Sequence, residues 1–498
     1  MTAERNPWSA LTALVVGYFM VVLDMTIVAV ANPVIMESLN TGVSQVVWAT
    51  SAYLLTFAAL LLPAGRLGDY LGPRSVYLWG LALFTLASLG CGLADSVTVL
   101  IAARAVQGVG AAMVTPQTMA MITRIFPPER RSAAMSLWGG VAGLANLVGP
   151  LLGGVLADQV GWEWIFFSNV PVGAAGLILA IRFVPVLTSH TSERRRRFDI
   201  PGVVLSFTGM FLLVFGIQEG GNRGWEAWLG WMIAAGVAVL VVFTVYQGRT
   251  TREPLLPLSI FRDRNFALSS VAVAAAAAAV AAIMVPLYFY LEQVRSLSGV
   301  GAGLLLAPMA ILAMLFVPVV GMFGDRLHPR LIPVAGFTLF AATLMGFATL
   351  MTPDSPIPVF LVGAALAGIA NACLWPSLAV TATLNLPLHQ AGAGAGAYNT
   401  MRQVGSVLGS AAIAAVVASR MAVHDLGGER AAAEGVAAGE VPESAMAAFG
   451  AALSESMYLP VALLVLGAVT AAFIIRRATD AAPAPAPAPA PPKQQAED

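Results

Sequence analysis

Long apolar runs, separated by short polar stretches, recur along the chain as far as about residue 476. Each has the roughly 20 residues that a helix needs to cross the hydrocarbon core of a bilayer. The pattern predicts fourteen transmembrane helices, at residues 9–33, 46–65, 75–94, 97–122, 133–157, 164–184, 200–219, 228–248, 266–290, 300–323, 331–351, 357–383, 394–419 and 456–476. The first run lacks a small-residue cleavage site, so we expect a retained helix and not a signal peptide.

Composition agrees with a membrane protein. Of the 498 residues 58% are hydrophobic and only 10% are charged, whereas a soluble domain has about 25% charged residues. The two cysteines, Cys91 and Cys373, fall inside apolar runs and predict neither a disulfide framework nor a metal site. We therefore expect an all-α integral membrane protein that is monomeric, binds no nucleic acid and uses no cofactor.

The arginines predict the orientation of the chain. If both ends are cytoplasmic, twenty basic residues fall in inner segments and four in outer loops. Basic residues gather in cytoplasmic loops, so we expect a plasma (inner) membrane protein with both termini inside. The polybasic run at residues 193–198 is interpreted as a topology determinant that touches anionic lipid.

An internal repeat predicts the domain organisation. "GRLGDYLGPR" at 65–74 resembles "GMFGDRLHPR" at 321–330, and "GVGAAMVTP" at 108–116 resembles "GIANACLWP" at 368–376. Helices 1–6 therefore correspond to helices 9–14, and helices 7 and 8 are an insert. The expected units are an N-terminal six-helix bundle at 1–190, the inserted helices with their linkers at 191–264, a C-terminal six-helix bundle at 265–478 and a Pro/Ala-rich tail at 479–498. Two such halves with a site between them are typical of secondary transporters.

Two opposite charges lie at similar predicted depth in the first half. Asp24 is about 13 Å before the end of helix 1 at Pro33, and Arg104 is about 10 Å into helix 4 from the same face, at 1.5 Å per residue. Intramembrane charges are costly unless they are paired, so both are expected to face the bundle interior. A carboxylate whose access alternates between two sides can carry a proton. A static ion pair, or a bond from Asp24 to a neighbouring backbone, is the alternative.

The repeated inner loop is a candidate conformational switch. It contributes Gly65, Asp69, Gly72 and Arg74 in the first copy, and Asp325 and Arg330 in the second. The glycines allow a tight turn, and an aspartate can accept bonds from a helix N-terminus or from nearby arginines. Such a cluster could hold the two halves together in one state. A plain inner loop that obeys the charge rule would explain the arginines but not the repeated aspartate.

Two further sets of residues are weaker candidates. Gly149, Pro150, Gly153 and Gly154 in helix 5 predict a close, kinked helix contact, for which ordinary packing is an equal explanation. Polar and aromatic residues at membrane depth together suggest a roomy, mostly apolar substrate cavity, although packing or helix–helix bonding explains each of them alone better: Tyr53, Gln107, Gln117, Trp138, Asn146, Tyr288, Asn371, Trp375 and Asn399.

Together these stretches resemble the major facilitator superfamily and, within it, the fourteen-helix drug:H+ antiporters. The resemblance rests on "LDMTIVAVANP" in helix 1, "GRLGDYLGPR" in the loop after helix 2, "RAVQGVGAA" in helix 4 and "GPLLGG" in helix 5, with "WEWIFFSNVPVG" from Trp162 as a fifth. It implies proton coupling and substrate recognition for Asp24, proton coupling for Arg104, the switch for Asp69 and Arg74, and the antiport-associated bend for Gly149 and Pro150.

The sequence therefore predicts a proton-driven antiporter that exports amphipathic organic compounds by alternating access. A dedicated exporter of one metabolite, antibiotic, siderophore or lipid could share every motif. A non-transporting sensor is a further alternative. A membrane-bound enzyme is disfavoured because the four histidines, at 190, 328, 389 and 424, are scattered over loops. ATP hydrolysis is not expected to drive transport, because no Gly-Lys-Ser/Thr phosphate loop occurs.

Overall fold

A computed structural model describes residues 6–187, 199–223, 225–250, 253–324, 326–352, 354–424 and 443–475. Every regular element in these ranges is a helix, and fourteen candidate spans are long and apolar enough to cross a membrane, which confirms the predicted fold class. The polybasic run at 193–198, Asp325 and the tail at 479–498 lie outside the described residues.

The helices fall into the three expected groups along the chain. The first comprises α1 (Pro7–Ser38), α2 (Val43–Leu71), α3 (Pro73–Gly92), α4 (Val97–Ile125), α5 (Pro128–Gln159), α6 (Glu163–Phe167) and α7 (Asn169–Phe183). The inserted pair is α8 (Ile200–Arg223) and α9 (Ala227–Arg249). The last group comprises α10 (Arg264–Phe289), α11 (Gly299–Gly324), α12 (Leu331–Leu350), α13 (Ile357–Thr383), α14 (Ala391–Val423), α16 (Glu443–Ser456) and α17 (Tyr458–Ala472).

Two predicted spans differ in detail from the structure. The sixth is divided at Ser168 into α6 and α7, although the backbone angles of Ser168 stay close to helical (φ −62°, ψ −28°). The last candidate span covers Ala447–Ala472, so it begins nine residues before the predicted start at 456 and takes in α16. The additional helix, α16, packs against α10, α12 and α14.

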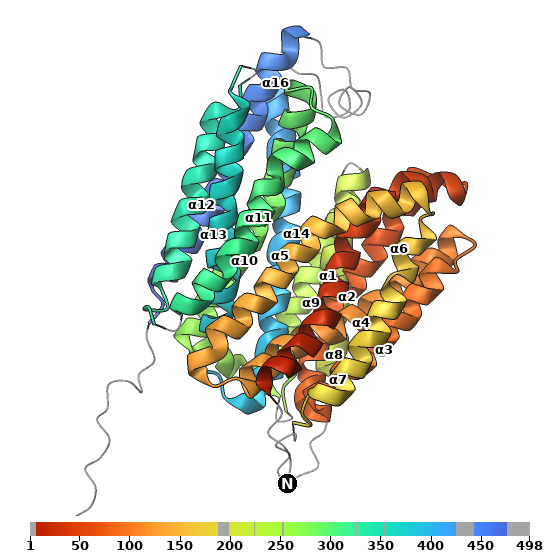
Figure 1. Cartoon of the computed structure of the whole chain (residues 1–498), viewed down its shortest axis with the longest axis vertical. Coiled ribbons are helices and arrows are strands. Elements are labelled where there is room, and N and C mark those ends of the chain that lie inside the picture. Colours follow the sequence, from red (N-terminus) through yellow and green to blue (C-terminus); the bar gives the residue numbers. More distant parts are fainter. Residues whose placement is uncertain are drawn as a thin grey trace, which may run out of the picture.

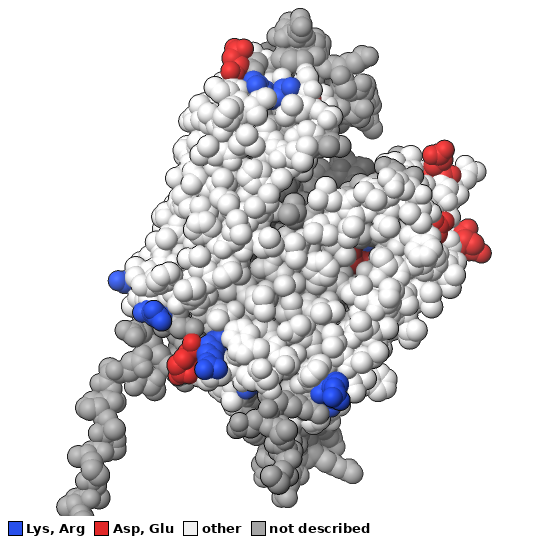
Figure 2. All heavy atoms as spheres, in the orientation of Figure 1, with Lys and Arg blue, Asp and Glu red and all other residues white. Residues whose placement is uncertain are grey.

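The two groups of spanning helices form two bundles that lie side by side in Figure 1, with α1–α7 in one and α10–α17 in the other. They meet through α2 and α4 against α14, and through α5 against α11 and α13. The contacts near the end where α1 begins include Gly65 against Gly392 and Gly396, and Gly140 against Val317. At the opposite end the bundles diverge, and Figure 2 shows the surface hollowed between them. The chain is therefore closed at one end and open at the other.

The inserted helices pack on the outside of this junction. α8 lies against α9, and its Met210 and Val214 cluster with Leu55 and Ala58 of α2. Val404 of α14 packs against the same cluster. The insert therefore contacts both bundles along the α2–α14 side.

Candidate functional site

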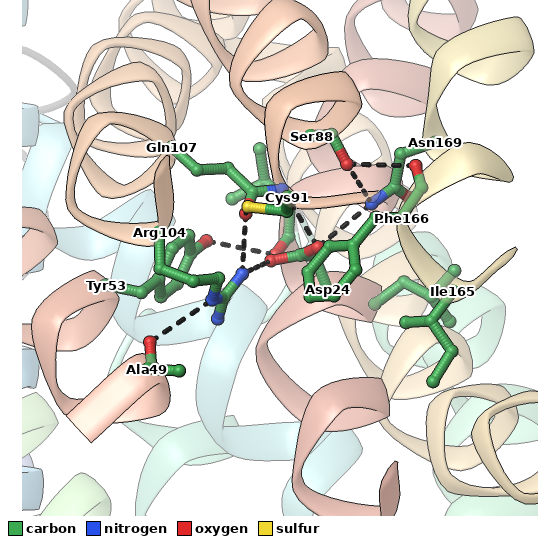
Figure 3. Close-up of polar contacts among 12 residues, drawn as sticks. Asp24, Ala49, Tyr53, Ser88, Cys91, Arg104, Gln107, Ile165, Phe166 and Asn169 are labelled. Carbon is green, nitrogen blue, oxygen red and sulfur yellow. Dashed lines mark hydrogen bonds and ion pairs between the residues drawn. The ribbon is translucent and has the colours of Figure 1, made fainter. Parts of the chain in front are cut away.

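The interior of the first bundle holds an ion pair at membrane depth. Asp24 lies in the middle of α1 and Arg104 in the first third of α4, and neither side chain has any exposed surface. An Nη atom of Arg104 donates to a carboxylate oxygen of Asp24, as Figure 3 shows. The predicted match in depth therefore corresponds to direct contact, while the functional roles of both residues stay predictions.

Arg104 is held by two neighbours on α2 as well as by the carboxylate. Its Nε donates to the carbonyl of Ala49 at 3.3 Å, and its guanidinium carbon lies 4.2 Å from the centroid of the Tyr53 ring. A cation over an aromatic face is attracted by the ring quadrupole, most strongly where water is excluded. The pair is thus fixed against α2 in a site without exposed surface.

Amide side chains complete the carboxylate's hydrogen bonds. Gln107 Nε2 and Asn169 Nδ2 donate to the second oxygen of Asp24 at 3.0 and 2.9 Å. Gln107 Oε1 accepts from Arg104 at 2.7 Å, and Asn169 also donates to Ser88 Oγ at 3.1 Å (Figure 3). Buried carboxylates are tolerated when their lone pairs are filled in this way. Adding a proton to Asp24 would cancel its charge and weaken all three contacts at once.

Two residues of this site, Asn169 and Ser88, were not among the predicted site residues. Asn169 starts α7 directly after the break at Ser168, so its side chain is directed into the bundle. The quoted stretch "WEWIFFSNVPVG" already contains it. An asparagine next to a helix break at the depth of a buried charge was the available signal.

A second ionic cluster closes the end of the molecule where the bundles meet. Asp69, near the end of α2, accepts from Arg124 Nη2 at 2.6 Å and lies 3.8 Å from Arg66. It also accepts from the backbone N–H groups of Gly392 and Ala393, at 2.9 and 2.7 Å. These residues begin α14 in the other bundle, so a carboxylate of one bundle caps a helix of the other.

The other predicted switch residues have different surroundings. Gly65 abuts the α14 backbone, and Gly72 has a φ of 90°, which favours glycine. Arg74 donates to the Ile181 carbonyl at 2.7 Å within its own bundle, and Arg330 is exposed. Arg124, which the sequence analysis counted only as an inner basic residue, is the principal cation on Asp69. The structure therefore joins Asp69 to Arg124 and α14, and leaves Arg74 and Arg330 apart from it.

The glycines of α5 bring that helix against α1 close to Asp24. A Cβ at Gly149 would collide with Thr26, and one at Gly153 would lie 2.7 Å from the Ile27 carbonyl oxygen. Gly154 is partly buried in the same helix, which also contains Pro150. Small residues thus allow the close α1–α5 approach, as expected of them.

The predicted cavity residues lie in different surroundings. Tyr53 and Gln107 belong to the Asp24 site, and Gln117 donates to the Ala64 carbonyl at 2.7 Å beneath the α2 end. Asn371 accepts from Trp375 at 2.9 Å, while Asn146 and Tyr288 are exposed. Trp138 stacks on Tyr18, and Asn399 contacts Met119 across the junction. Contact with cargo stays a prediction for each.

The sequence matches the Major Facilitator Superfamily over residues 14–410. The chain belongs to this superfamily. As a superfamily member it is a transport protein, and the fourteen apolar helices are consistent with a multi-pass membrane protein. The two-bundle arrangement described above is accordingly that of a transporter, as predicted from the repeat.

Known relatives place this superfamily member near exporters. It is 48% identical to an uncharacterised MFS-type transporter of Mycobacterium tuberculosis, over 95% of this chain and 81% of that one. It is 36% identical to the tetracenomycin C resistance and export protein of Streptomyces glaucescens, over 84% of this chain and 77% of that one. Its fold is similar to that of the proton:xylose symporter XylE, with a TM-score of 0.62 and 13% identity over 93% of this chain and 94% of that one.

Proposed function

We propose that the chain is a proton-coupled antiporter that exports amphipathic organic compounds by alternating access. The observation that carries this proposal is the Asp24–Arg104 pair, a proton acceptor sealed inside one bundle of a two-bundle transporter. An intramembrane ionisable group is by default a functional candidate, and this one is the carboxylate to which both Arg104 and Asn169 are directed.

In the proposed cycle, the end closed by Asp69 faces the cytoplasm. The basic side chains visible in Figure 2 gather mainly at that end, which supports this orientation because basic residues favour the inner face. A proton from outside neutralises Asp24 and loosens its contacts with Arg104 and Asn169. The bundles then rock, the Asp69 contacts with α14 break, and cargo is accepted from the inside as the proton leaves.

Alternating access requires two arrangements of nearly equal free energy. The closed end combines apolar contacts between the bundles with charge-assisted hydrogen bonds on Asp69, and such bonds exchange for water at modest cost. The tight glycine contact between Gly65 and α14 is formed in this arrangement and would be lost in the other. The two features support a latch that opens once per cycle.

The test is proton-driven flux in proteoliposomes with an imposed pH gradient. Wild type is compared with Asp24→Asn, and with Asp95→Asn as a control, because Asp95 is an exposed carboxylate in the loop before α4. Cationic, neutral and anionic naphthalene derivatives serve as cargo. The proposal predicts gradient-driven flux for wild type and Asp95→Asn and its loss in Asp24→Asn. Equal flux by Asp24→Asn would remove Asp24 from proton coupling, and flux of every probe independent of the gradient would overturn antiport.

A dedicated exporter of a single compound is the second candidate. The resemblance to a protein described as exporting tetracenomycin C favours it. A broad exporter should move several unrelated amphipathic compounds at comparable rates, whereas a dedicated exporter should prefer one by a large factor. Competition between unlabelled compounds for one fluorescent cargo distinguishes the two.

A further inference from the structure

A second intramembrane arginine lies in the other bundle. Arg402 is 11 residues into α14, which places it about 17 Å along the helix from its start at the closed end. It is partly buried, and no described carboxylate pairs with it. Arg104 in the first bundle, by contrast, is paired with Asp24. An unpaired cation within a membrane-spanning helix is costly and normally marks a route for ions or substrate.

Aromatic side chains from both bundles lie near the helical turn that precedes Arg402. Tyr398 precedes Arg402 by four residues on α14, so the two residues share one face of the helix. Tyr18 of α1 stacks on Trp138 of α5, with ring centroids 4.9 Å apart. Tyr18, Trp138 and Tyr398 also belong to one apolar cluster that crosses between the bundles. Arg402 therefore adjoins the junction that opens and closes in alternating access.

Several polar atoms at this junction have no partner among the described residues. Trp138 is 2% exposed and its Nε1 lacks an acceptor, while Tyr398 is 1% exposed and its hydroxyl group is unpaired. Asn399, which is 0% exposed, has an unpaired Oδ1. Buried polar atoms are normally hydrogen-bonded, and a cluster of exceptions calls for a ligand or for a state in which they are paired. Indole N–H and arginine are donors only, so the unmet demand is mainly for an acceptor.

We propose that Arg402 is the anion-recognising residue of the cargo site, and that the preferred cargo is an aromatic organic acid in its ionised form. The acid group would lie on the Arg402 guanidinium, whose planar donors match carboxylate and sulfonate oxygens. The aromatic part would lie against Tyr18 and Trp138, with Trp138 Nε1 and the Tyr398 hydroxyl group available to further acceptors. This rests on the proposed export function and narrows its substrate class.

A cation would lack a counter-charge here. Asp24 is enclosed in its own bundle and engaged by Arg104, so it is not presented to cargo at the junction. A positively charged compound would instead meet Arg402 at close range in a region of low dielectric, where like charges repel strongly. The same geometry therefore selects against amphipathic cations.

Binding to the purified full-length protein in lipid nanodiscs tests the proposal without reference to proton coupling. Three naphthalenes of matched size are compared: naphthalene-2-sulfonate, which is permanently anionic, naphthalene-2-sulfonamide, which is neutral, and trimethyl(2-naphthylmethyl)ammonium. Displacement of radiolabelled naphthalene-2-sulfonate, corrected with empty nanodiscs, gives the affinities. The sulfonate should bind about 10- to 100-fold more tightly than the other two, the range expected for a charge-assisted bond.

Variants connect the preference to the residue. Arg402→Gln should lose the preference for the sulfonate, and Arg402→Lys should retain part of it because the charge remains. Arg420→Gln is the matched control, since Arg420 is an exposed arginine at the far end of the same helix and pairs with Glu455. Equal binding of the three compounds, a preference for the cation, or a preference unaffected by Arg402→Gln would overturn the proposal, as would a failure of all three to bind.

Flux measurements separate this proposal from the function on which it rests. If the pH gradient drives export of the cation and Arg402→Gln changes nothing, antiport stands and the acid preference is wrong. If the sulfonate binds through Arg402 but no gradient drives its flux, the site stands and proton coupling is wrong.

Discussion

Asp24 and Arg104 form an ion pair in which neither side chain has exposed surface, between the middle of α1 and α4. Such a pair costs desolvation free energy that the mutual attraction and the surrounding hydrogen bonds must offset. Gln107 and Asn169 provide those bonds. Loss of one charge should therefore be far worse for stability than loss of both.

A double-mutant cycle tests this expectation. Arg104→Gln alone leaves a buried carboxylate without its cation and should destabilise the protein by about 3–5 kcal/mol. The Asp24→Asn and Arg104→Gln double variant should be closer to wild type than either single variant. The measurement is Tm in detergent by intrinsic fluorescence. Additive losses in the double variant would mean that the two residues are energetically independent.

Asn169 is expected to stabilise the Asp24–Arg104 site, although its side chain carries no charge. Asn169→Leu removes donors to Asp24 and to Ser88, and a hydrogen bond to a charged group contributes about 1.5–3 kcal/mol. We expect a lower Tm and reduced proton-driven flux. Asn32→Leu, in the outer part of α1, is the comparison variant. Unchanged flux in Asn169→Leu would show that the pair works without the α7 contact.

The closed end should open when Asp69 loses its charge. Asp69→Asn weakens the bond from Arg124 and the cap on α14, so the population should shift about tenfold or more toward the arrangement open at that end. Spin labels at Val186 and Leu331, exposed positions on opposite bundles, report the separation by pulsed electron paramagnetic resonance. The labels are introduced as cysteines after Cys91 and Cys373 have been replaced. An unchanged distance distribution would contradict the latch.

Glu253 provides a graded comparison in the same assay. It lies 3.2 Å from Arg66 but its side chain is 33% exposed, whereas that of Asp69 is 3% exposed. Solvent-exposed ion pairs contribute about 0–1 kcal/mol. Glu253→Gln should therefore shift the distances much less than Asp69→Asn. Equal shifts would mean that the Arg66–Glu253 ion pair contributes as much to closure as the bonds between Asp69 and α14.

A steric prediction tests the same closure without changing any charge. A Cβ at Gly65 would lie 2.5 Å from the Gly392 carbonyl oxygen and 2.8 Å from the Gly396 Cα, all of it backbone that cannot turn aside. Gly65→Ala should disfavour the closed end and reduce flux, while Gly42→Ala, which meets nothing within 4 Å, should not. Normal closure in Gly65→Ala would show that α2 and α14 can separate slightly at little cost.

The sequence was sufficient for the number of spans and for the similar depth of Asp24 and Arg104, because apolar length gives the helices and residue counting gives depth. It did not assign Tyr53, Gln107 or Arg124 to their partners. In a membrane bundle both the lipid face and the packed face are apolar, so the pattern does not show which way a side chain is directed. Tyr53 of α2 was therefore predicted at membrane depth, but its contact with Arg104 was not predicted.

The inserted pair has a mechanical consequence. The inserted helix α8 contacts both α2 and α14, so it covers the contact between the bundles on that side. On the other side, the bundles meet through α5 and α11. In the proposed rocking motion, α8 would slide along at least one bundle, and acyl chains beside α5 and α11 would adjust to the change in shape. Bilayer thickness and lateral pressure would then act on the proposed cycle asymmetrically, through the α5–α11 side.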